Sequence, residues 1–163
     1  MEIDSNFPKA IGVSNFRSNL LAFGNFRWEI LLNDWPDSRF LTSDFPLAVE
    51  ETKDASLINR VLPLTPKLAI RIRPRLDLSK LDLGSDTFEH FRFRRVRLSH
   101  SEVREINQII VRSAENMVFS SVGFSWVAKF VERNRRFRVQ GIYDRIPHGT
   151  GFISLARTRV REC

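Results

Sequence analysis

The clearest pattern of hydrophobic and polar positions lies in the second half of the chain and predicts an amphipathic helix. Ser99 is followed three residues later by Glu102, the capping-box pattern that marks the start of a helix. Beyond this start, apolar residues recur at helical spacing in one stripe: Val103, Ile106, Ile110, Ala114, Met117 and Val118. A second helix is predicted over residues 124–135, with an apolar face of Val127, Phe130 and Val131.

Alternating segments predict strands on both sides of these helices. Residues 57–74 predict two strands that meet near Thr65 and Pro66, and 137–161 predict two more around a turn at 147–151. The second strand of the first pair has the period of a half-buried strand. Its apolar residues Leu68, Ile70 and Ile72 are expected to point inward. They alternate with Ala69, Arg71 and Arg73, which are expected to point outward.

Residues 91–99 also predict a strand, but its apolar positions change parity halfway. Phe91 and Phe93 share one parity, whereas Val96 and Leu98 share the other. A β-bulge resets the alternation by inserting one extra residue, so we expect a bulge at Arg94–Arg95. All four apolar side chains would then face inward, and the outward positions would be Arg92, Arg94, Arg95 and Arg97.

The first part of the chain predicts a long helix and a short strand. Residues 14–33 can form an apolar helical face from Leu20, Leu21, Trp28, Leu31 and Leu32. Residues 39–44 predict the strand, and the polar stretch 77–87 predicts a loop. Because helices and strands do not alternate regularly, we expect an α+β fold with a mainly antiparallel sheet and two to three packed helices. The length of 163 residues fits a single domain over 1–163.

Composition and charge narrow the classes of function. The only cysteine is Cys163, and the three histidines have no metal-ligand spacing, so neither a metal site nor a cofactor is predicted. No apolar run reaches the roughly 18–20 residues of a membrane helix and no signal peptide is evident, which predicts a cytoplasmic protein without a membrane partner.

The charge is unevenly distributed along the chain. Residues 1–59 hold five Lys and Arg against nine Asp and Glu, whereas 60–104 hold eleven against five and 129–163 hold nine against three. This uneven charge indicates an anionic partner for the later part of the chain.

Rows of arginine on the predicted strands are the candidate anion-binding residues: Arg71, Arg73, Arg92, Arg94, Arg95, Arg97, Arg157 and Arg159. If they shared one sheet face, their like charges would repel unless an anion lay between them. Nucleic-acid phosphates are the first choice, because guanidinium groups suit phosphate geometry. Two other interpretations stay open, namely an acidic protein partner and a solvated face whose arginines pair with the acids of the N-terminal part.

A second candidate site is the turn Thr42-Ser43-Asp44 together with Asn107. A hydrolase- or nuclease-like enzyme could use Ser43, Asp44 and Asn107, with Arg71 as an anion clamp. The structural interpretation gives Asp44 a turn-forming role near Pro46, and it makes Asn107 a clamp for the 42–46 turn or the 63–66 bend.

Three segments in order carry a family resemblance: FLTSDFPLAV at 40–49, LPLTP at 62–66 and the VREIN…A…VFSS helix at 103–121. Over about residues 28–121 they resemble the C-terminal part of a bacterial family known as domain of unknown function 4238 (DUF4238). Members usually begin with a His-x-x-Pro-like segment and a long helical region, which this chain lacks, so the resemblance also allows a truncated remnant that is stable as a homo-oligomer. It implies no reaction. The leading hypothesis is a non-enzymatic binding module with an Arg-rich face.

Overall fold

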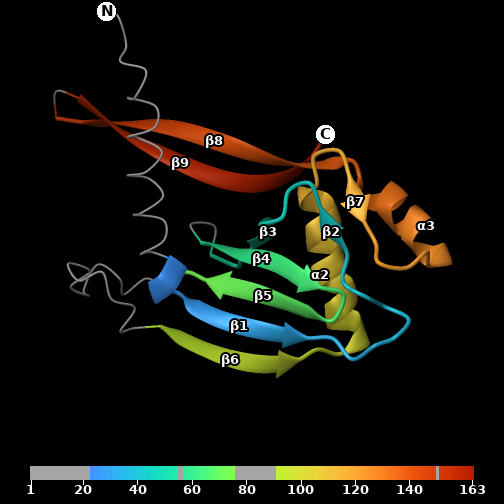
Figure 1. The fold of residues 1–163 in the computed structure, drawn as a ribbon. Coiled ribbons are helices and arrows are strands. Elements are labelled where there is room, and N and C mark those ends of the chain that lie inside the picture. Colours follow the sequence, from blue (N-terminus) through green and yellow to red (C-terminus); the bar gives the residue numbers. More distant parts are fainter. Residues whose placement is uncertain (1–22, 55–56, 76–90, 150) are drawn as a thin grey trace, which may run out of the picture.

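The centre of the protein is a five-stranded sheet in the order β3-β4-β5-β1-β6 (Figure 1). The computed structural model describes residues 23–54, 57–75, 91–149 and 151–163. Strand β1 runs antiparallel to β5 and parallel to β6, and the remaining pairs are antiparallel. The predicted α+β class with mainly antiparallel sheets is confirmed. The strand bounds are β1 (Arg27–Leu32), β3 (Ala48–Glu51), β4 (Ile58–Thr65), β5 (Leu68–Arg73) and β6 (Arg92–Arg97).

The helix predicted over 14–33 is wrong in its second half, because residues 27–32 form β1 at the interior of the sheet. Trp28, Ile30 and Leu32 alternate with Glu29 and Leu31, so the segment has strand periodicity as well as helical spacing. Its backbone pairs with β5 on one side and β6 on the other. These ladders are long-range pairings, which local helix propensity does not report. Residues 14–22 and the loop predicted at 77–87 lie outside the described residues.

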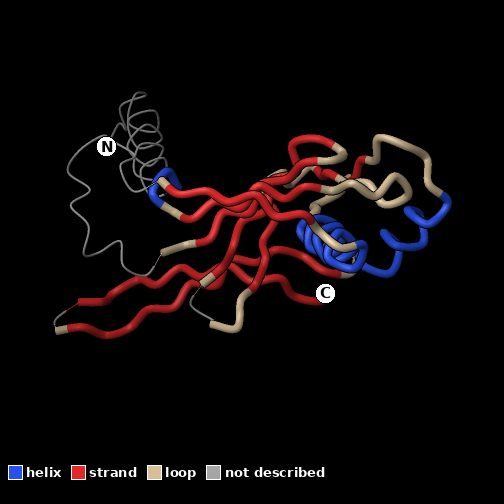
Figure 2. Tube along the Cα trace, turned by 90° about the horizontal axis from the view of Figure 1, so that it is seen from below, coloured by secondary structure: helices blue, strands red, loops and turns tan. Residues whose placement is uncertain are grey.

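Helix α2 (His100–Ser113) packs against one face of this sheet (Figure 2). The predicted capping box is present, since Ser99 accepts from the Glu102 amide and the Glu102 carboxylate accepts from the Ser99 amide. The helix ends at Ser113, earlier than the predicted stripe, and Met117 is exposed. The core between helix and sheet contains Leu31, Val61, Ala69, Val103, Ile106 and Ile110.

Of the remaining elements, β2, α3 and β8 contact α2. The strand predicted over 39–44 is reduced to β2 (Thr42–Ser43), which pairs with β7 (Val118–Phe119). The second predicted helix is confirmed as α3 (Ser125–Asn134), and its apolar face packs against the core. The last two predicted strands are confirmed as a hairpin of β8 (Phe137–His148) and β9 (Gly151–Glu162). Gly149 in its turn has a φ of 57°, a left-handed conformation that favours glycine.

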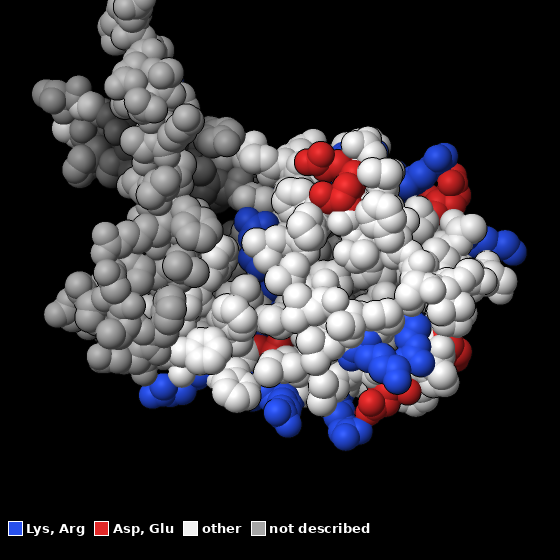
Figure 3. Space-filling model, viewed as in Figure 1, with Lys and Arg blue, Asp and Glu red and all other residues white. Residues whose placement is uncertain are grey.

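Both faces of the sheet carry apolar side chains, and β5 is oriented differently from the prediction. Ala69, expected to point outward, is fully buried in the core that α2 covers. Leu68 and Ile70 lie on the opposite face and are half-buried, together with Trp28, Ile30 and Leu32 of β1. Helix α2 lies behind the sheet in Figure 1, and in the same view the described surface of Figure 3 is largely uncharged. No helix within the described ranges is long and apolar enough to cross a membrane.

The predicted bulge at Arg94–Arg95 is wrong. Strand β6 pairs with β1 residue for residue, from Arg27 opposite Arg92 to Leu32 opposite Arg97. The alternation therefore continues unbroken, so Val96 packs against the core while Phe93 lies on the other face, 56% exposed. Leu98 has the same parity as Val96, so it turns to the same face and is buried, and its amide donates to the Leu32 carbonyl at 3.0 Å.

The unbulged register gives a stability prediction. Leu98→Ala should lower the free energy of unfolding by about 3 kcal/mol, because it leaves a cavity in the core. Phe93→Ala should lower it by less than about 1 kcal/mol, since that ring is largely solvent-exposed. Urea denaturation of both variants measures the difference. Equal losses would contradict the register, because a bulge would bury both side chains.

Candidate functional site: a cationic groove between two helices

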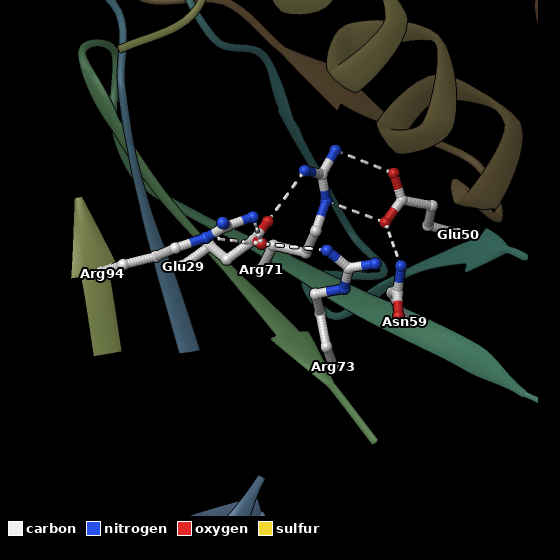
Figure 4. A network of polar contacts seen from close by, with 6 residues as sticks. All are labelled: Glu29, Glu50, Asn59, Arg71, Arg73 and Arg94. Carbon is white, nitrogen blue, oxygen red and sulfur yellow. Dashed lines mark hydrogen bonds and ion pairs between the residues drawn. The ribbon is translucent and has the colours of Figure 1, made fainter. Parts of the chain in front are cut away.

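The sheet arginines expected to meet an external anion contact a carboxylate of this chain. Glu29 stands in β1 with its side chain only 4% exposed. The register places it opposite Arg71 of β5 and Arg94 of β6. Its carboxylate accepts from Arg71 Nη1 at 3.1 Å, Arg73 Nη1 at 3.0 Å and Arg94 Nε at 3.0 Å (Figure 4). Three guanidinium groups thus surround one buried acid.

Arg71 extends this network to a second carboxylate. Its Nη2 donates to Glu50 Oε1 at 2.8 Å, and its Nε lies 2.8 Å from Glu50 Oε2. Glu50 also accepts from Asn59 Nδ2 at 2.7 Å. Burial by itself would lower the pKa of Arg71, but the attraction of Glu50 and the bonds to both carboxylates outweigh it and raise the pKa. The network therefore links side chains from all five strands of the sheet, with charged groups from four of them and the Asn59 amide from β4.

The candidate arginines do not share one face of one sheet, as the hypothesis of an arginine-lined sheet face required. Arg92 and Arg94 lie on the Glu29 face, whereas Arg95 and Arg97 lie on the opposite one because the bulge is absent. Arg97 pairs with the exposed Asp34 at 2.5 Å, and Arg92 donates to the Phe91 carbonyl. The remaining two candidates, Arg157 and Arg159, lie on the separate β8–β9 hairpin, and the side chain of Arg157 is outside the described residues. Pairing with N-terminal acids is therefore the interpretation that fits Arg71, Arg73, Arg94 and Arg97.

The turn proposed for enzyme chemistry is engaged with the backbone. Asp44 accepts hydrogen bonds from the amides of Glu115, Asn116 and Met117 at 3.0, 2.8 and 3.1 Å. Desolvation by itself would raise the pKa of Asp44, but the hydrogen bonds from the backbone amides outweigh it and lower the pKa. Ser43 Oγ accepts from the Phe45 amide at 3.3 Å in a local turn. Asp44 thus ties the chain beyond α2 to the 42–46 turn.

Asn107 is a structural clamp of the expected kind, although it holds a different segment. Its side chain is completely buried. Its Oδ1 accepts from the Leu41 amide at 2.8 Å, and its Nδ2 donates to the Arg39 carbonyl at 2.8 Å. It therefore fixes residues 39–41 on α2, rather than the 42–46 turn or the 63–66 bend.

A groove of about 470 Å³ lies between α2, α3 and residues 37–38. Helix α2 supplies residues four and three positions apart, His100, Arg104 and Asn107, which share one face. The loop is joined to α3 because Trp126 Nε1 donates to the Asp37 carbonyl at 3.0 Å. From the other wall, the lining residues are Phe124, Ser125, Trp126, Lys129, Phe130 and Arg133.

The cations of this groove differ from those of the sheet. Arg104, Lys129 and Arg133 are exposed, and none has an ion pair or a side-chain hydrogen bond to another described residue. The single carboxylate in the lining, Asp37, lies 3.7 Å from His100 Nε2. Three uncompensated cations therefore face a hollow whose walls are otherwise largely apolar.

Aromatic rings form much of the apolar lining. Phe124 and Trp126 are stacked, with centroids 5.9 Å apart and planes 15° apart. Phe130 stands edge-on to Trp126, at 5.6 Å and 87°. Because Trp126 is also anchored by its indole hydrogen bond, these rings have a fixed geometry.

The groove continues along α2 into a second hollow of about 540 Å³, which shares His100, Arg104, Phe130 and Arg133 with the first. Arg112 lines this extension, held by Asn134 Oδ1 at 3.0 Å and by the Phe137 ring 4.0 Å from its guanidinium carbon. Among the described residues no group of His, Cys, Asp and Glu is placed to hold a metal ion.

This groove was not predicted from the sequence, where helical periodicity placed Phe130 on an apolar face and indicated no site on this helix. The available signal was the spacing of Lys129 and Arg133, one helical turn apart and next to Trp126 and Phe130. The position of α2 opposite them has no sequence signal, because it depends on packing.

The chain belongs to the family described as "Protein of unknown function (DUF4238)", whose profile matches residues 6–123. The match is longer than the resemblance over 28–121 and includes the sheet and α2. Neither the curated proteins nor the solved structures gave a match. Because the matched region ends before Ser125, the groove combines a wall inside the family region with a wall outside it.

The Glu29 network gives a second prediction. Glu29→Gln should lower the free energy of unfolding by about 3 kcal/mol, because it leaves partly buried guanidinium groups without their shared charge. Asp34→Asn is the matched control, and it should cost less than about 1 kcal/mol because that pair is exposed. Urea denaturation measures both. A loss at Glu29 no larger than at Asp34 would contradict the central role of the network.

The same network also determines how the free energy of unfolding changes with pH. Burial by itself would raise the pKa of Glu29, but the hydrogen bonds from Arg71, Arg94 and Arg73 outweigh it and hold the pKa below its usual 4.5. The stabilisation is therefore present above the unfolded-state pKa and is lost as the pH falls through the folded-state pKa. The unfolding free energy should decrease in acid less steeply for Glu29→Gln than for the natural chain.

Asn107 gives a third prediction. Asn107→Leu should cost about 3 kcal/mol, because a buried amide and a buried carbonyl lose their partners. The same substitution at the exposed Asn116 should change stability by no more than about 0.5 kcal/mol. Thermal and urea unfolding measure both variants, and equal stability would contradict the clamp.

Proposed function

We propose that this protein is a non-enzymatic binding module whose groove between α2 and α3 receives an anionic partner, nucleic acid first. The single observation that carries the proposal is the contrast between two sets of cations. Arg71, Arg73 and Arg94 already contact Glu29, whereas Arg104, Lys129 and Arg133 have no carboxylate partner among the described residues. Cations without partners around a concave surface attract anions from solution.

Nucleic acid is favoured among anions for two reasons. Lys and Arg side chains that contact phosphates displace the counterions condensed on the nucleic acid, and the release of these counterions drives association. The groove also places aromatic rings next to its cations, a combination that suits bases attached to phosphates. The hydrolase- or nuclease-like alternative has less support, because Ser43, Asp44 and Asn107 contact backbone groups.

Binding should be tested with labelled DNA and RNA at 50 and 200 mM salt. The triple variant Arg104→Ala, Lys129→Ala, Arg133→Ala should bind at least about tenfold more weakly, with a shallower dependence on salt. The control triple Lys67→Ala, Arg95→Ala, Arg97→Ala removes the same residue types from exposed positions outside the groove and should bind like the natural chain.

Three outcomes would overturn parts of this proposal. Absence of binding by the natural chain at low salt would remove nucleic acid as the partner. Binding of polyglutamate in its place would assign the groove to an acidic protein. A loss in the control triple without a loss in the groove triple would move the site to the β6 edge.

A further inference from the structure

The groove has features that specify a kind of nucleic acid, and this step rests on the function proposed above. We infer that it binds single-stranded nucleic acid, with an unpaired base against the aromatic rings and the flanking phosphates on the cations. The site is assembled from Arg104 of α2 and from Trp126, Lys129, Phe130 and Arg133 of α3.

The four α3 residues lie on one side of that helix. Trp126, Lys129, Phe130 and Arg133 are spaced by three, one and three positions, so they alternate ring and cation along a single stripe. Phosphate-binding groups therefore stand within one helical turn of ring faces. A strand whose phosphates and bases alternate along its length has the matching pattern.

The shape of the hollow favours a base that is not paired. Its volume of about 470 Å³ is in the range of sites for small molecules. The faces of bases in a duplex are covered by their neighbours, and only their edges reach a protein. Aromatic rings that line a hollow between two helices can contact only a base that has left the duplex.

The rings are already positioned for such stacking. Trp126 is held by the Asp37 carbonyl and by its stacked neighbour Phe124, while Phe130 is half-buried against the core. Rings fixed before binding lose little conformational freedom when a base arrives.

The length of the groove favours a strand over a free nucleotide. The second hollow extends the path past Arg104 and Arg133 to Arg112. The lining of this extension also includes Glu105, so the cations available to a second phosphate are those at its junction with the first hollow, Arg104 and Arg133.

The amides near this path are committed within the protein. Asn107 serves Leu41 and Arg39, and Asn134 Oδ1 accepts from Gln108 and Arg112. Recognition then depends on ring faces and phosphates, which all sequences offer, so we expect little sequence preference.

The test compares four probes at low salt: a 20-nucleotide oligo(dT), an abasic strand of the same length, a 20-base-pair duplex and ATP. Oligo(dT) should bind at least about tenfold more tightly than each of the others. Phe130→Leu keeps an apolar side chain but removes the ring, and it should abolish most of the preference over the abasic strand. Phe93→Leu, an exposed ring outside the groove, is the matched control and should leave the preference unchanged.

A second measurement does not depend on the stability of the Phe130 variant. Intrinsic tryptophan fluorescence of the natural chain should be quenched by oligo(dT) and not by the abasic strand, and Trp126→Phe should remove that quenching. Equal affinity for the abasic strand, or tighter binding of duplex or ATP, would overturn the single-strand inference and leave the proposed function standing. Absence of binding to all four probes would overturn nucleic acid as the partner in the proposed function itself.

Discussion

The fold depends on the burial of one carboxylate, Glu29, in the interior of a β-sheet. A buried acid is costly unless cations and hydrogen bonds surround it. Here the compensation comes from Arg71 and Arg94 on the two neighbouring strands, with Arg73 on the same face. A register slip of one residue would turn these side chains to the other face, so the charge network selects the pairing of β1 with both neighbours.

This network also decides where an external anion can act. Arg71 and Arg73 of β5 and Arg94 of β6 are ion-paired with Glu29, and Arg71 also with Glu50, so carboxylates of this chain already engage their guanidinium groups. The cations left without partners in the described groove are Arg104, Lys129 and Arg133, which lie between α2 and α3. Asn107 joins α2 to Leu41, and Trp126 joins α3 to the Asp37 carbonyl. The proposed binding surface is therefore built on elements that hydrogen bonds hold in place.

Local patterns predicted some elements well and others poorly. The capping box at Ser99 and Glu102 specified the start of α2 because its contacts lie within four residues. The parity change in β6 suggested a bulge, but the strand keeps its alternation, so Val96 and Leu98 face the core while Phe93 lies on the opposite, exposed face. Asp44 and Asn107 were identified as important positions, whereas their partners at 115–117 and 39–41 could be found only from the folded chain.

The sequence alone determined the α+β class, the hairpins β4–β5 and β8–β9, both packed helices and the excess of cations, because these follow from local periodicity, turns and counts. Tertiary structure decided that residues 27–32 form a strand, that the β6 arginines divide between two faces, and that the unpaired cations meet aromatic rings in a groove. Each of these depends on which distant segments lie side by side. Pairing and packing of distant segments are set by the burial of the whole chain, which no local window of sequence contains.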